Sequence, residues 1–236
     1  MRTNKPTAWL LLLLTCCLMT NQLNAQKAYL SVSAGYALPM GQQTLTGISF
    51  SNYTVVSNGA ISRQAAVSLG AGMNWGASVG YLFNKNLGAE LSFSYLKGAE
   101  QTAQNVYPTE STHYSLQSNA IRMIPSLVIT CKVGGVNPYA RLGLLISNGY
   151  VTYGTTTITD EGSSETVVEM KGGTGLGVSS AMGAAVKLNK KLSVFGELNL
   201  ISLAYAPTRS EMTRFTYLGT DLLSNLTVCE RKKIFV

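Results

Sequence analysis

A strict alternation of apolar residues with small or polar residues over 74–97 constrains the fold of this chain more than any other feature. Extended backbone would place Trp75, Ala77, Val79, Tyr81 and Phe83 on one face, and after Asn84-Lys85-Asn86 the same face continues with Leu87, Ala89, Leu91, Phe93 and Tyr95. A period of two residues indicates β-strands. A three-residue polar link between such strands is typical of an antiparallel hairpin. The stretch therefore predicts a hairpin with one apolar face.

The length of each strand points to a membrane. Each has roughly 9–11 alternating residues, which is enough to cross a bilayer when the strand is tilted. Aromatic residues such as Trp75, Phe83 and Tyr95 stand near the ends of the apolar face, where membrane interfaces favour them. We interpret the stretch as one hairpin of a transmembrane β-barrel.

Composition agrees with a barrel rather than with a helical membrane protein. Charged residues make up 12% of the 236 residues and hydrophobic residues 46%, so the charged share is about half of the usual one. Beyond the N-terminus there is no apolar run of the roughly 20 residues that a membrane-spanning helix needs. Alternation dilutes apolar residues in a barrel strand and produces this profile. We expect a single barrel domain over 26–236.

Residues 1–25 are predicted to be a secretory signal peptide. A positively charged start precedes an apolar segment at 8–19, and the small residue Ala25 marks a plausible cleavage site. The apolar segment is too short to span a membrane as a helix. An N-terminal anchor, or a lipoprotein signal at Cys16 or Cys17, is the alternative. The signal peptide predicts secretion across the inner membrane.

Alternation repeats along the chain and predicts seven strands. Short links at 84–86, 134–137 and 189–191 alternate with long polar connections at 42–73, 98–119 and 160–171 and after 206. Short turns at one rim and long loops at the other are the plan of a transmembrane barrel. The strands are expected at 27–39, 74–83, 87–97, 120–133, 138–146 with a continuation to 157, 172–188 and 192–206.

A soluble barrel of the lipocalin type would also alternate short and long connections. Its outer face would be charged and its apolar face would surround a ligand. In this chain the second face consists mostly of Gly, Ser and Ala with a few charges. This composition suits a narrow, filled lumen better than a solvated exterior.

Several phrases resemble the small outer-membrane β-barrel proteins of Gram-negative bacteria, the group that includes the OmpA transmembrane domain and OmpX. They are Ser33-Ala34-Gly35-Tyr36, Pro138-Tyr139-Ala140-Arg141-Leu142-Gly143 and Leu192-Ser193-Val194-Phe195-Gly196-Glu197, together with the leader that ends at Ala25. The resemblance implies an antiparallel up-and-down barrel of eight strands with periplasmic turns, extracellular loops and a packed interior. It also implies three partners: outer-membrane lipid, the barrel-assembly machinery and an unknown extracellular ligand.

The C-terminal part departs from this pattern. Barrels of this class have an even number of strands, whereas the chain offers seven, and 207–236 is mostly polar. The resemblance implies a final apolar strand with a terminal aromatic residue, which the assembly machinery reads. Two interpretations remain open: the chain is truncated before its eighth strand, or 218–228 serves as a poor eighth strand.

Four charged residues fall on the inward face of predicted strands: Glu90, Arg122, Arg141 and Glu197. A charge in a narrow lumen has to be paired. Glu90, Arg141 and Glu197 each lie a few residues from a short turn, so we predict a structural lumenal charge cluster in which Arg141 bridges the two carboxylates. Arg122 is expected nearer the long-loop mouth. An ion path through the lumen is the alternative.

We identify no catalytic, cofactor-binding or metal-binding residue. The two inward carboxylates have no nucleophile or metal ligand nearby in sequence, and the four cysteines show no CxxC spacing. The single histidine, His113, stands near Ser111 and Glu110 in a predicted loop, which leaves a lipid-modifying enzyme as a remote alternative.

The charge pattern gives no support for a nucleic-acid partner. The net charge is +7, but Lys and Arg are scattered along the chain rather than gathered on one helix or among aromatic residues. The sequence therefore predicts a non-enzymatic outer-membrane protein with a structural or surface-interaction role. A small porin-like channel is the second hypothesis.

Overall fold

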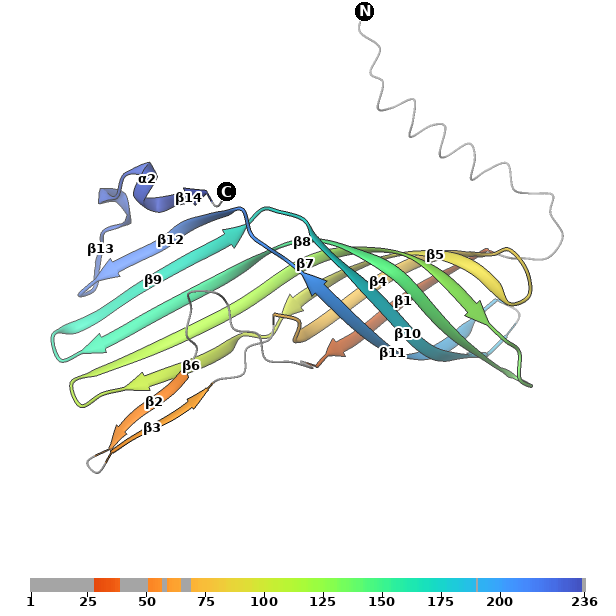
Figure 1. The fold of residues 1–236 in the computed structure, drawn as a ribbon, viewed down its shortest axis with the longest axis horizontal. Helices are drawn as coiled ribbons and strands as arrows, with labels where there is room; N and C mark the ends of the chain where they lie inside the picture. Colours follow the sequence, from red (N-terminus) through yellow and green to blue (C-terminus); the bar gives the residue numbers. More distant parts are fainter. Residues whose placement is uncertain (1–27, 39–50, 57–58, 65–68, 190, 235–236) are drawn as a thin grey trace, which may run out of the picture.

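The computed structural model describes residues 28–38, 51–56, 59–64, 69–189 and 191–234. These residues form one sheet of 14 strands with very little helix (Figure 1). Nearly all pairings are antiparallel, and the predicted all-β, antiparallel architecture is confirmed. The predicted signal peptide, 1–25, lies outside the described residues and stays a prediction.

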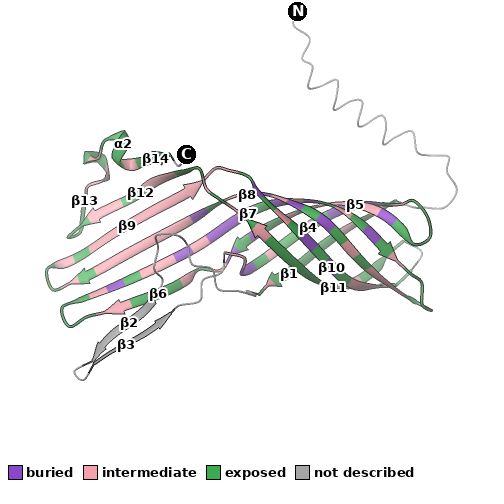
Figure 2. Cartoon of the chain, viewed as in Figure 1, coloured by how far each residue is buried: buried purple, intermediate pink, exposed green. Residues whose placement is uncertain are grey.

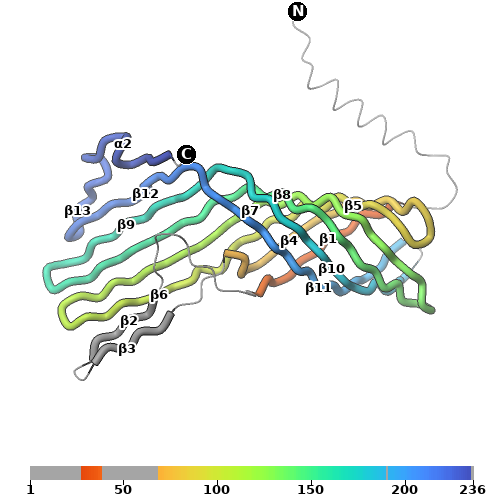
Figure 3. Tube along the Cα trace, in the orientation of Figure 1, coloured from red at the N-terminus to blue at the C-terminus, as the bar shows by residue number. Residues whose placement is uncertain are grey.

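Seven strands form a curled sheet, called here the barrel sheet, and each of them overlaps a strand predicted from the alternation. Neighbours along it are joined by antiparallel ladders, and its strands twist around a common axis (Figures 1 and 3). In spatial order the strands are β1 (Ala28–Ala37), β4 (Gly72–Leu82), β5 (Leu87–Gly98), β7 (Glu110–Thr130), β8 (Val136–Thr159), β10 (Gly175–Lys187) and β11 (Ser193–Ala204).

The barrel sheet is not closed. Within the described residues β1 pairs only with β4, and β11 pairs only with β10. The eight-strand count therefore stays a prediction.

The alternative eighth strand at 218–228 is wrong. This segment contains β13 (Thr220–Asp221), the 3-10 helix η1 (Leu223–Asn225) and the first residue of α2 (Val228–Arg231), and β13 pairs with β12 rather than with β1. The segment lacks the alternating apolar face that a strand in lipid requires.

β7 and β8 run well beyond the barrel sheet, with 21 and 24 residues. Their far halves pair with each other from Glu110 opposite Thr159 to Tyr150 opposite Asn119, and they carry further strands at both edges (Figure 1). We call this part the long-loop sheet. Its other strands are β2 (Ser51–Val56), β3 (Gly59–Gln64), β6 (Gln101–Val106), β9 (Gly162–Lys171), β12 (Arg209–Tyr217), the short β13 and β14 (Lys232–Ile234).

The long-loop sheet corrects the prediction that 98–119 and 160–171 are connections. The first range contains β6 and the start of β7, and the second is mostly β9. These segments are polar, but the first contains Thr, Tyr and Val and the second Thr and Val, which favour strands when neighbours can pair with them. The predicted continuation of the fifth strand to 157 is confirmed, since β8 ends at Thr159.

The two faces of the barrel sheet have the reverse of the usual burial. Along β4, β5 and β10, exposed and buried residues alternate (Figure 2). The exposed set consists of large apolar side chains such as Leu30 (77% exposed) and Leu198 (75%), whereas Ser78, Glu90 and Ser179 are buried. An apolar exterior around a polar interior is the arrangement of a barrel in lipid. Among the described residues, no helix is long and apolar enough to cross a membrane.

The backbones of β5 and β7 lie in close contact at the junction of the two sheets, so adding a single methyl group there should lower stability. A Cβ at Gly98 would stand 2.1 Å from the carbonyl oxygen of Ser118. We expect Gly98→Ala to lower the free energy of unfolding by about 1–3 kcal/mol, because the strands must separate. Urea unfolding of the refolded protein in detergent measures the change.

Gly196→Ala is the matched control, because no atom lies within 4 Å of a Cβ built at that position. It should leave the urea midpoint within experimental error. Equal midpoints for the two variants would show that the β5–β7 contact is looser than described here.

Candidate functional site: the charged interior

The ladders bring three of the four predicted charged residues to one level inside the barrel sheet. Glu90 on β5 is opposite Ser126, and two residues further along β7, Val128 is opposite Arg141 on β8. Arg141 in turn pairs with Ala181 of β10, two residues from Gly183, which faces Glu197 on β11. Because small residues separate the charged ones, the long side chains can reach across the interior.

Arg141 forms ion pairs with both glutamates. Its Nη1 donates to Oε1 of Glu90, and its Nη2 donates to both carboxylate oxygens of Glu197. All three side chains are largely buried, with 17%, 4% and 13% of the side chain exposed in the order Arg141, Glu90 and Glu197. We call these three residues the interior charge cluster.

Hydroxyl groups complete the hydrogen bonding of the two carboxylates. Tyr29 of β1 donates to Oε2 of Glu90 at 2.6 Å, and Tyr139 of β8 donates to Oε2 of Glu197 at 2.9 Å. Ser92 Oγ donates to Oε1 of Glu90 at 2.8 Å. Charge-assisted bonds of this kind are stronger than neutral ones. The network therefore ties β1, β5, β8 and β11 together across the interior.

Sequence reasoning did not identify Tyr29 and Ser92 as partners of the cluster. Both have the inward parity of their strands, and Ser92 stands two residues from Glu90. Parity was thus a usable signal for the face, but the pairing of Tyr29 with Glu90 also needs the register of two ladders, β1 with β4 and β4 with β5.

Arg122, the fourth predicted residue, lies apart from the interior charge cluster. It stands on β7 four residues from Ser126, which faces Glu90. Four residues of strand correspond to about 14 Å. Arg122 is buried, with 4% of the residue exposed, and it forms no ion pair with any described residue.

The outer face of the same strands is apolar and has aromatic side chains at two levels. Trp75 and Tyr95 stack with ring centroids 6.3 Å apart, and Tyr81 and Phe83 meet at 5.9 Å nearer the short turns. Eight residues separate Trp75 from Phe83, or about 26 Å of strand, which at the usual tilt of about 40° spans about 20 Å of the roughly 25 Å apolar band of outer-membrane barrels.

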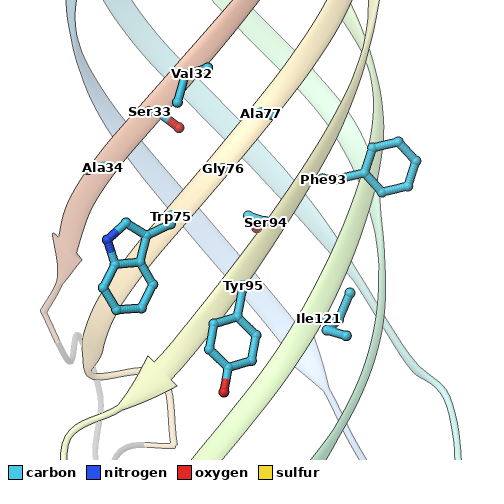
Figure 4. Close-up of a pocket in the computed structure, with 10 residues that line it drawn as sticks. All are labelled: Val32, Ser33, Ala34, Trp75, Gly76, Ala77, Phe93, Ser94, Tyr95 and Ile121. Carbon is cyan, nitrogen blue, oxygen red and sulfur yellow. The ribbon is translucent and has the colours of Figure 1, made fainter.

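An open hollow of about 650 Å³ lies beside the Trp75–Tyr95 pair on this outer face. Figure 4 shows Trp75, Phe93, Tyr95 and Ile121 extending from β4, β5 and β7, while the small residues at Ala34, Gly76 and Ala77 form its floor. Most of its lining is apolar, and Ser33 and Ser94 supply the hydroxyl groups at its base.

The surroundings of His113 do not form a catalytic relay. Its Nε2 lies 3.5 Å from Ser111 Oγ on an exposed part of β7, and the carboxylate of Glu110 accepts a hydrogen bond from Thr112. The described residues contain no group of three or more His, Cys, Asp or Glu that could hold a metal ion. Cys131 and Cys229 are free and exposed.

An apolar outer surface with aromatic residues at two levels, around a packed and charged interior, defines the class of outer-membrane β-barrels. The comparison with protein families agrees: the chain matches the family described as "Outer membrane protein beta-barrel domain" over residues 8–218, and it belongs to this family. The resemblance found in the sequence is thereby confirmed, and the family locates the protein in the outer membrane. Searches of curated proteins and of solved structures found no match.

A second ionic network holds the edge of the long-loop sheet. Glu211 on β12 accepts from Lys171 of β9 at 3.3 Å and from Lys232 of β14 at 3.2 Å. Lys171 also contacts Glu169 at 2.8 Å. Hydrogen bonds from Lys232 and Lys171 lower the pKa of Glu211, and the hydrogen bonds to Glu169 and Glu211 raise the pKa of Lys171.

Removal of Arg141 tests the interior charge cluster. Arg141→Met leaves two buried carboxylates without their cation, and breaking a buried ion pair in this way costs about 3–5 kcal/mol. We expect a loss of that order in the free energy of unfolding, measured by urea titration with Trp75 fluorescence as the readout.

The triple variant Glu90→Gln, Arg141→Met, Glu197→Gln removes the charges together and is the control for this measurement. It should recover a large part of the lost stability, because no uncompensated charge remains. An unchanged urea midpoint for Arg141→Met alone would contradict a structural role of the cluster.

Acid should loosen the edge of the long-loop sheet. The folded-state pKa of Glu211 is lowered, so its stabilising effect is complete above the pKa of the unfolded state and is lost as the pH falls through the folded-state pKa. The protection factors for hydrogen exchange at Ser210 and Lys233, which pair across β12 and β14, should fall in that pH range once the exchange rates are divided into the intrinsic rates at each pH. In Glu211→Gln this fall should be absent; if it persists, another group controls this edge.

Proposed function

We propose that this chain is a non-enzymatic outer-membrane barrel whose interior is closed by its charge cluster and whose long-loop sheet is an interaction surface outside the cell. The observation that carries the proposal is the continuity of β7 and β8, which belong to both sheets. A large part of the chain thus forms ordered structure beyond the apolar outer face of the barrel sheet. A sheet of this size is more than is needed to connect membrane strands.

The interior argues for a structural barrel rather than a channel. Arg141 reaches carboxylates on β5 and β11, and Tyr29 and Tyr139 fill the space beside them. A conducting pore needs a water-filled lumen. Ion pairs across the lumen near the short turns oppose such a path.

The long-loop sheet has features of a stable binding surface. Ala103, Leu116 and Val151 form a buried core, with Leu69, Tyr114 and Tyr153 packed against it. Stacking of Tyr114 on Tyr153, with centroids 6.4 Å apart, connects β7 to β8. A rigid scaffold positions its exposed residues for recognition at little entropic cost.

Conductance separates this proposal from the porin-like alternative. The refolded full chain in planar bilayers should give no stepwise current. The variant Glu90→Ala, Arg141→Ala, Glu197→Ala, which empties the cluster, should conduct if the cluster is the barrier. Stable openings of the unmodified protein at neutral pH would replace the proposal with a channel.

The two exposed free cysteines test which rim faces outward. Cys131 follows β7 beside the short turn at 134–137, whereas Cys229 lies in α2 beside the long-loop sheet. On intact cells a membrane-impermeant maleimide should label the Cys131→Ser variant, which keeps Cys229, and should not label Cys229→Ser. The opposite pattern would place the long-loop sheet in the periplasm and would end the surface role.

A further inference from the structure

Arg122 is a buried cation that its own protein leaves without a counter-charge. All 11 acidic residues of the chain lie among the described residues, and none of them forms an ion pair with Arg122. Its Nε is buried and has no hydrogen-bond partner. A charge removed from water is retained in a fold only where something compensates it.

The residues around Arg122 on the inner face are small and uncharged. Ser94 of β5 and Ser147 of β8 stand directly opposite it in the two ladders, and Gly76 follows Ser94 in the next strand. The position therefore has hydroxyl groups near the guanidinium and no carboxylate. A second buried polar atom without a partner, Asn74 Oδ1, lies on the same inner face two strands away.

Two barriers separate this position from other charges. Toward the short turns lies the interior charge cluster, in which Arg141 already holds both glutamates. Toward the long loops, Leu96 and Leu116 are almost completely buried. Arg122 thus lies between the interior charge cluster and a layer of buried leucines.

We propose that Arg122 anchors a binding site for one small inorganic anion inside the barrel. An arginine side chain has only donors, so the missing partner must be an acceptor, and a negative charge also compensates the cation. Ser94 Oγ, which donates to no other described residue, is positioned to supply a further hydrogen bond. The anion site is independent of the proposed surface role. If no anion binds, the results expected from cysteine labelling and from conductance stay the same.

Compensation from a distance is the competing explanation. The interior charge cluster has two carboxylates and one guanidinium, so its excess negative charge could balance Arg122 from about 14 Å along the strand. In that case no anion would bind. Thermal unfolding in different salts distinguishes the two.

The experiment uses the refolded chain in an uncharged detergent at constant ionic strength. Sodium gluconate, whose anion is bulky, is replaced stepwise by sodium bromide or by sodium phosphate. At an anion concentration of about one hundred times the dissociation constant of the site, Tm should be about 5 °C or more higher, and above the dissociation constant the rise should follow the logarithm of the anion concentration. No such rise in either salt would overturn the proposal in favour of distant compensation.

Two variants connect the effect to the site. Arg122→Met should abolish the anion-dependent rise, whereas Arg214→Met, which removes an exposed arginine paired with Glu165 in the long-loop sheet, should retain it. The same rise in Arg122→Met would overturn the proposal.

If Arg122→Met does not refold, Arg122→Lys keeps the charge but lacks the planar donor set. Its bromide titration should shift to about tenfold higher concentration, and an unshifted titration would overturn the site. Crystals soaked in bromide give a direct measurement: an anomalous peak in contact with the Arg122 guanidinium is expected, and bromide only elsewhere would overturn the assignment.

Discussion

The need to pair every backbone N–H and C=O within lipid governs this structure, because hydrocarbon offers no hydrogen-bonding partner. β4, β5, β7, β8 and β10 satisfy it with a neighbour on each side. β1 and β11 have one neighbour each among the described residues. The outer edges of β1 and β11 are therefore where backbone groups of the barrel sheet still require partners.

Pro125 is a local exception to the pairing of every backbone group, and the structure around it shows how the two strands stay together. It lies within β7, where it has no N–H to donate, and the pairing of β7 with β8 skips Ile124 and Pro125 before it resumes in the same register. Gly143 faces the gap, and a Cβ there would stand 2.7 Å from the Pro125 carbonyl oxygen. The close approach of bare backbone keeps the two strands together where a hydrogen bond is missing.

The sequence alone was enough to predict the seven membrane strands and the inward face of each, because lipid enforces a strict period of two. That parity brought Glu90, Arg141 and Glu197 to the interior, and short turns of similar length set them at one level. The long-loop sheet escaped the same reasoning. Outside lipid neither face has to be apolar throughout, so polar stretches such as 160–171 lose the contrast that marks a strand. β9 pairs with β8, which precedes it, and also with β12, which lies some forty residues away in the chain.

The junction between the two sheets decides whether they behave as one body. At this level Gly98 and Gly149 bring neighbouring backbones into contact, at 2.1 Å and 2.2 Å from a built Cβ to the carbonyl oxygens of Ser118 and Asn119. Leu96, two residues from Gly98, is almost fully buried. Unbroken strands, close backbone packing and a dry layer leave little freedom for bending. The long-loop sheet is thus held in a fixed direction relative to the barrel sheet, and a ligand bound to it would meet a surface already ordered by the strands that cross the membrane.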